Sequence, residues 1–205
     1  MLEMVTKGGP IMWFILACSM VATVVFLERL FHFHRAQIKS ADFLKGIFNI
    51  LQRKNIVEAV SICEETPGPV AFIVKTAILH HEDDDREMGR AIQEAGLAEI
   101  PRLEKNMGLL ATMAHVTPLL GLLGTVLGMM KILLVMQQNT PLVQAGDLAM
   151  GMWEALVSTA AGLAVAIPAY IAYNFLVGRI ESIVLDMERA SSEIMAFLSG
   201  QQDHA

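Results

Sequence analysis

The chain has 205 residues, of which 54% are hydrophobic and 18% are charged, and its formal net charge is −6. Soluble domains are about 45–50% apolar and about 25% charged, so the apolar excess is too large for one soluble core of this length. The composition excludes a disordered chain, a collagen and a disulfide scaffold, and the two cysteines are expected to be reduced. The negative charge argues against a nucleic-acid-binding protein.

Three long blocks hold most of the apolar residues: 8–27, 107–136 and 148–178. The charged residues within these blocks are Lys131 and Glu154. Because a helix needs about 20 apolar residues to cross a bilayer core, the blocks predict transmembrane helices at 10–28, 107–136 and 150–177. Interior helices of a soluble protein, or a cleaved signal sequence for the first block, are weaker alternatives.

Lysine and arginine indicate the orientation of the spans, because they accumulate on the cytoplasmic side. Eleven of the fifteen lie in residues 29–106, whereas residues 137–149 contain none. We therefore expect residues 1–9 and the 137–149 loop to face the periplasm. Residues 29–106 and 178–205 are expected to face the cytoplasm.

The cytoplasmic segment between the first two spans is predicted to be helical. Ser40 or Asp42 is suited to begin a helix, because short oxygen-bearing side chains accept bonds from first-turn N–H groups. Ile56, Val60 and Cys63 continue a second apolar stripe, the Thr-Pro-Gly-Pro sequence at 66–69 breaks it, and a short third helix covers 70–79.

A polar run of histidines and acids at 80–85 follows. It is interpreted as a solvated turn and not as a metal site, because consecutive residues do not converge on one ion. The next helix is predicted to run from Arg86 through Glu104 into the second span, with a possible kink at Pro101. The third span continues as a helix to Gly200. The predicted class is an all-α integral membrane protein whose second and third transmembrane helices extend into a cytoplasmic helical domain.

Glu154 is the most informative residue of the sequence. An ionisable side chain within a span usually faces a cavity or a bundle interior and marks an ion or proton path. A position near the outer headgroups is the alternative. No inward-facing basic partner is evident, since Lys131 lies about 9 Å outward of Thr125 at 1.5 Å per residue and is expected to anchor at the outer surface. His115 is expected to be a packing or interface residue.

Hydroxyl side chains accompany Glu154. Ser158 shares its helical face, and Thr159, about 140° round the helix, borders that face. Thr125 and Thr159 lie equally far from the middle of the outer loop, so they are expected at similar depth. These hydroxyl groups and the carboxyl group form a plausible hydration path.

A stripe of small residues accompanies the hydroxyl groups: Gly121, Gly124 and Gly128 on the second span and Gly162 on the third. Such residues permit close approach of two helices in a membrane. We expect a packing role for them.

The second and third apolar blocks carry a family resemblance. The run Pro-Leu-Leu-Gly-Leu-Leu-Gly-Thr-Val-Leu-Gly at 118–128 resembles the second span of the MotA/TolQ/ExbB proton channel family, and Glu-Ala-Leu-Val-Ser-Thr-Ala-Ala-Gly at 154–162 resembles its third span. The segment at 27–36 is similar to the exit from the first span. Three spans fit the ExbB and TolQ branch better than the four-span MotA pattern. The 118–128 run favours ExbB, with TolQ as the alternative.

The resemblance implies a function and a set of partners. It implies a homopentamer in the lipid of the bacterial inner membrane around the single spans of two ExbD-like subunits, which supply a proton-accepting Asp. The output is TonB, which energises outer-membrane transport. Thr125, Glu154 and Thr159 match pore-lining polar positions of the family. No cofactor, metal or nucleic acid is implied.

Two other classes of function compete with this stator. A self-contained transporter predicts inverted repeats or paired half-helices, which three spans do not offer. A structural scaffold predicts that Glu154 is dispensable. An enzyme is disfavoured, because the sequence contains no phosphate-binding loop, nucleophile elbow or zinc motif.

Overall fold

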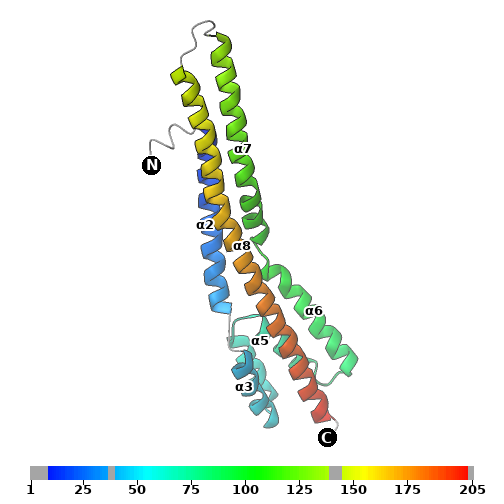
Figure 1. The fold of residues 1–205 in the computed structure, drawn as a ribbon. Coiled ribbons are helices and arrows are strands. Elements are labelled where there is room, and N and C mark those ends of the chain that lie inside the picture. Colours follow the sequence, from blue (N-terminus) through cyan, green and yellow to red (C-terminus); the bar gives the residue numbers. More distant parts are fainter. Residues whose placement is uncertain (1–8, 37–39, 139–144, 203–205) are drawn as a thin grey trace. The chain divides into compact units, whose positions relative to one another are not determined.

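The computed structural model describes residues 9–36, 40–138 and 145–202 (Figure 1). These residues form seven helices and no strand. The helices are α2 (Gly9–Ala36), α3 (Ser40–Gln52), α4 (Ile56–Glu65), α5 (Pro69–Leu79), α6 (Asp85–Leu103), α7 (Met107–Gln138) and α8 (Ala145–Gln202). Most of the expected N-terminal periplasmic segment, and the middle of the 137–149 loop, lie outside the described residues.

Three of the helices contain stretches long and apolar enough to cross a membrane: Gly9–Phe33, Met107–Gln138 and Leu148–Gly200. The predicted all-α class is therefore confirmed, and so are three helices of membrane-spanning length. The expected continuation of the third span is also found, because α8 is one helix of 58 residues.

The predicted continuity of α6 with α7 is wrong. Helix α6 ends at Leu103, with Glu104 as its C-terminal cap, and α7 begins at Met107. Asn106 between them has a φ of +62°, in the left-handed region that asparagine tolerates better than most residues. Pro101 lies in the last turn of α6 and does not kink a longer helix.

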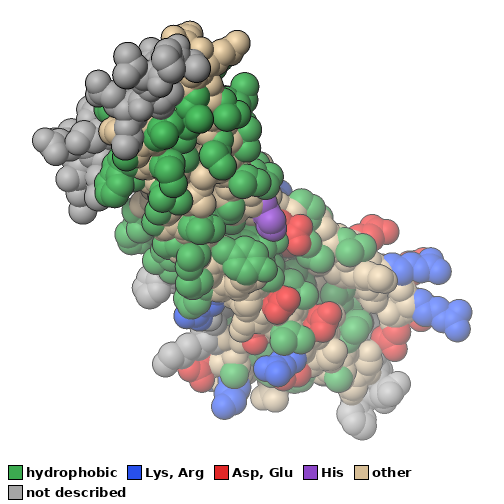
Figure 2. Space-filling view, turned by 45° about the horizontal axis from the view of Figure 1, so that its top comes forward, with side chains coloured by type: hydrophobic (Ala, Val, Ile, Leu, Met, Phe, Trp, Pro, Cys, Tyr) green, Lys and Arg blue, Asp and Glu red, His purple; other side chains and the backbone are tan. Residues whose placement is uncertain are grey.

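The chain divides into two compact units, which we describe separately. The span unit comprises Met1–Glu28 and Asn106–Phe175, and the polar unit comprises Arg29–Lys105 and Leu176–Ala205. Hydrophobic side chains cover the visible face of the span unit, whereas acidic and basic side chains gather over the polar unit (Figure 2). The exposed apolar side chains of the span unit include Trp13, Phe14, Leu119, Leu133, Leu156 and Ile171. Such a surface is what lipid tails require.

The polar unit is held together by large apolar side chains. Helices α3 and α4, α4 and α5, and α5 and α6 pack in succession. Fully buried side chains in this unit include Ile47, Val74, Ile78, Met88 and Ile194. The C-terminal part of α8 joins this core through Phe197, whose ring stacks on Phe48 of α3 at 4.7 Å between centroids.

Local sequence signals determine where the polar unit's helices begin and end. The Asn55 side chain accepts a bond from the Glu58 N–H, which caps the first turn of α4. Pro69 occupies the first turn of α5, where its missing N–H is harmless, and Gly68 before it has a φ of 128° that favours glycine. The predicted interruption at 66–69 is therefore confirmed.

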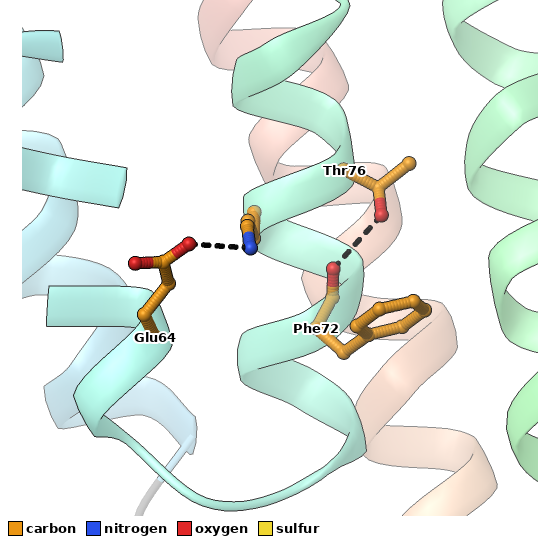
Figure 3. Close-up of polar contacts among 4 residues, drawn as sticks. Glu64, Phe72 and Thr76 are labelled. Carbon is orange, nitrogen blue, oxygen red and sulfur yellow. Dashed lines mark hydrogen bonds and ion pairs between the residues drawn. The ribbon is translucent and has the colours of Figure 1, made fainter. Parts of the chain in front are cut away.

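An ion pair joins α4 to α5 within the polar unit. Lys75 Nζ lies 2.7 Å from Glu64 Oε1, and one residue along α5 the Thr76 hydroxyl donates to the Phe72 carbonyl (Figure 3). Both groups of the pair reach water, with the Glu64 side chain 58% exposed and the Lys75 side chain 29% exposed.

Candidate functional site

Helices α7 and α8 meet in the span unit through small residues. The buried residues of α7 facing this interface are Thr117, Gly121, Gly124 and Gly128. Their counterparts on α8 are Gly151, Ala155, Ser158 and Gly162. Both sets repeat at alternating spacings of three and four residues, which places each set on one helical face.

The approach of the two backbones is very close. A Cβ atom added at Gly162 would lie 2.9 Å from the Thr117 carbonyl oxygen, and one at Gly128 would lie 2.8 Å from Ala155 Cβ. One added at Gly124 would collide with the Ser158 side chain. The structure thus places all four sequence-predicted glycines at this interface, where a side chain would separate the helices.

The predicted hydroxyl groups lie at or beside the same interface. Ser158 is buried, and its hydroxyl donates to the Ala155 carbonyl at 2.8 Å. The Thr159 hydroxyl crosses to the other helix and donates to the Gly121 carbonyl at 3.0 Å. Thr125 is half-buried, and its hydroxyl donates to the Leu122 carbonyl of its own helix.

The relative depth of these residues follows from the helix register. Gly121 lies against Gly162, and Gly128 lies against Ala155. In that antiparallel register Thr125 lies opposite Ser158, next to Thr159 in the chain. Each hydroxyl proton is donated to a backbone carbonyl. The oxygens of the half-buried Thr125 and Thr159 can each accept a further hydrogen bond.

The expectation that Glu154 lacks a basic partner is wrong. Lys131 Nζ of α7 lies 2.7 Å from Glu154 Oε2 of α8. The Lys131 side chain is 64% exposed and its ammonium group is bonded to this carboxylate; its anchoring role at the outer surface stays a prediction. Residue numbering along one helix does not reveal which residue of the neighbouring helix lies at the same level.

Gly9, at the start of α2, also meets Glu154. A Cβ atom on Gly9 would lie 2.4 Å from Glu154 Oε1, and Gly9 has a φ of +69°. Neither contact was predicted. For Gly9 the available signal was weak: a glycine next to Pro10 where an apolar helix begins.

His115 lies on the exposed side of α7. Its Nδ1 is 2.7 Å from the Ala111 carbonyl oxygen, and its ring meets Tyr170 of α8 edge-on, at 6.1 Å between centroids. The ring thus contacts α8, and the predicted packing or interface role stays a prediction.

The histidines of the polar run lie in the turn between α5 and α6. Nδ1 of His80 and of His81 lies 2.8 Å from the carbonyl oxygens of Thr76 and Ile78, respectively. Within the described ranges, no group of three or more His, Cys, Asp or Glu residues is arranged to hold a metal ion.

Residues 65–189 match the MotA/TolQ/ExbB proton channel family. The chain is 26% identical over 188 residues to a biopolymer transport protein ExbB homolog of Methanothermobacter thermautotrophicus. The aligned region is 91% of this chain and 66% of that relative, just under two thirds of its length. It is 31% identical to an ExbB-like protein of Synechocystis, over 82% of this chain and 80% of the relative. It is 38% identical to the Tol-Pal system protein TolQ of Haemophilus influenzae, over 55% of this chain and 49% of the relative.

Proposed function

The chain belongs to the MotA/TolQ/ExbB proton channel family, and we propose that it is an ExbB-like subunit of a proton-driven stator in the bacterial inner membrane. With an ExbD-like single-span partner, it couples the proton motive force to TonB-dependent transport at the outer membrane.

The observation that carries this proposal is the position of Glu154. Its carboxylate lies in an apolar span, with a side chain 19% exposed, about one helical turn from Ser158 and Thr159. Ser158, Thr159 and Thr125 supply oxygen atoms along the α7–α8 interface. Together the four residues form the polar part of a proton path.

This path needs a partner subunit. Glu154 is the one acidic residue of the three apolar blocks, and its carboxylate is already bonded to Lys131. A second titrating group, supplied by the single-span partner, completes the relay. The proposed assembly is a homopentamer around two such spans.

The proposed topology follows from the basic residues. Residues 1–9 and the 137–149 loop face the periplasm. The polar unit, which contains most of the lysine and arginine, faces the cytoplasm.

A TolQ-like stator of the Tol-Pal envelope system is the second candidate, favoured by the similarity to the TolQ protein of Haemophilus influenzae. Expressing the chain in bacteria that lack either ExbB or TolQ separates the two. Restored TonB-dependent uptake supports the first candidate, and restored envelope integrity supports the second.

Substitution of Glu154 tests the stator directly. Glu154→Gln and Glu154→Ala are expected to lower proton-driven uptake about 100-fold, because a positioned proton-transfer group contributes about that much or more. Native mass spectrometry of the complex with the co-expressed partner is expected to show unchanged assembly. Glu64→Gln, which removes a carboxylate of the polar unit, is the matched control and is expected to retain full uptake.

Two results would contradict the proposal. Full uptake in Glu154→Ala would leave only a scaffold role for the chain. Proton flux into liposomes that contain this chain without a partner would identify a self-contained channel.

A further inference from the structure

The Glu154 carboxylate lies among three helices of the span unit. Oε2 bonds to the ammonium group of Lys131 on α7, Oε1 faces the backbone of Gly9 at the start of α2, and the residue itself belongs to α8. One turn away on α8 lie Met150 and Ser158, neither of which is charged. Among the described residues, Lys131 therefore supplies the charge that faces Glu154.

The ammonium group of Lys131 has a specific partner within the protein. An anchoring lysine extends its ammonium group toward water or headgroups. The Lys131 side chain is 64% exposed, yet its ammonium group bonds to a carboxylate that is largely shielded. The Lys131 ammonium group is bonded to the Glu154 carboxylate, and a proton bound by that carboxylate would remove the charge that attracts the lysine.

We propose that Lys131, with the first turn of α2, is a latch that holds Glu154 in a bonded, closed state until a proton displaces the ammonium group. The inference rests on the proposed proton-path role of Glu154 and adds the regulation of that site. Lys131 is a positioning residue: it determines how readily Glu154 takes part in proton transfer and does not itself carry the proton.

Gly9 of α2 contacts the same carboxylate from a third helix. A methyl group at Gly9 would collide with Oε1, the flexible end of the Glu154 side chain, so the carboxylate would have to move. Gly9→Ala is therefore expected to disturb the latch in the same direction as loss of the Lys131 charge.

The first experiment tests the pair without requiring function. The full chain in lipid nanodiscs is compared with Lys131→Met, Glu154→Gln and the double variant by thermal unfolding. Lys131→Met leaves the largely shielded Glu154 carboxylate without its partner and is expected to lower Tm by about 4 °C or more. Glu154→Gln leaves a lysine that is 64% exposed and is expected to lower Tm less. The double variant is expected to lose less than the two single changes combined.

The same cycle at Lys75 and Glu64 is the matched control, because the substitutions and the bond length are the same but the Glu64 carboxylate is 58% exposed, against 19% for Glu154. There we expect changes within about 2 °C. Additive Tm changes at positions 131 and 154 would overturn the pair, and with it the latch.

The second experiment tests the latch. The complex with its single-span partner is reconstituted in liposomes, and proton flux is recorded with a pH-sensitive dye at a series of external pH values. Lys131→Met is expected to raise flux at neutral pH about tenfold. Lys131→Arg, which keeps the charge, is expected to match the parent within about twofold, and Lys75→Met to match it fully.

The outcomes separate this inference from the proposed function. If Glu154→Gln abolishes flux while Lys131→Met equals the parent, the proton path stands and the latch is overturned. If Lys131→Met and Lys131→Arg change flux equally, the charge is irrelevant and the latch is overturned. A parent complex without flux overturns the proposed function and the latch together, while the thermal cycle still decides whether the pair forms.

Discussion

Among the described residues, two lysine–glutamate pairs join neighbouring helices, one in each unit. Lys75 meets Glu64 in the polar unit and Lys131 meets Glu154 in the span unit, both at 2.7 Å. They differ in the carboxylate, which is 58% exposed in Glu64 and 19% exposed in Glu154. Water can solvate Glu64 when its lysine leaves, whereas Glu154 has few such alternatives. The surroundings of the carboxylate, and not the bond length, determine what each pair does.

The interiors of the two units also differ, in the size of the side chains that pack there. The polar unit buries large side chains such as Ile78, because apolar area removed from water stabilises a fold at about 25 cal/mol per Å². The span unit packs glycine, alanine and hydroxyl residues between α7 and α8. Lipid provides no hydrophobic drive between helices, so close backbone contact takes its place. Three predictions test this contrast, in decreasing order of expected effect.

The largest effect is expected from a cavity in the polar unit. Ile78→Ala removes a fully buried side chain and should lower the free energy of unfolding by about 2–5 kcal/mol. Thermal or denaturant unfolding of the purified chain measures it. Val57→Ala, at a position 81% exposed, is the control and should change little. Equal stability of the two variants would show that the polar unit does not depend on this core.

A smaller effect is expected from an added methyl group in the span unit. Gly162→Ala places a Cβ atom 2.9 Å from the Thr117 carbonyl oxygen, and backbone yields poorly. We expect a loss of about 1–3 kcal/mol and a broken bond between Thr159 and Gly121.

Gly108→Ala is the matched control, because nothing lies within 4 Å of that position and both changes raise helix propensity equally. Unfolding in nanodiscs measures both variants. A Gly162→Ala protein as stable as Gly108→Ala would refute the close approach of α7 and α8.

The smallest effect concerns a thiol of the polar unit. Burial raises the pKa of Cys63 to about 11, and the charge of Lys75 partly opposes the increase. The folded state therefore holds this proton more tightly than the unfolded state. Its contribution to stability is present below pH 9 and is lost as the pH rises through about 11.

Alkylation measures the state of this thiol. At pH 8 we expect Cys63 to react much more slowly in the folded protein than in denaturant, since the thiolate is the reactive form. Lys75→Met should slow the reaction further. Rapid labelling of Cys63 in the folded chain would contradict its burial.

Several elements could be predicted because their signals are local. Ser40 begins α3, the 66–69 segment separates α4 from α5, and three apolar blocks correspond to three long helices. The boundary between α6 and α7 could not be predicted, because it depends on a left-handed backbone at Asn106 that the other described asparagines, Asn49, Asn55 and Asn174, do not adopt.

For the candidate site too, the sequence identifies the residues but not the bonds between helices. Its residue types and helical spacing identify Glu154, Thr125, Ser158, Thr159 and the four glycines as a group. The spacing along one helix does not reveal that Thr159 bonds to Gly121, or that Lys131 bonds to Glu154. Both bonds depend on the register of one helix against another.

The sequence by itself determined the all-α class, the three apolar stretches, the family resemblance and the prominence of Glu154 within a span. These follow from composition and from short-range periodicity, which one chain segment contains in full. The tertiary structure decided which residues touch this carboxylate, namely Lys131 of α7 and Gly9 of α2. Those contacts join residues up to 145 positions apart, and only the packing of the three helices brings them together.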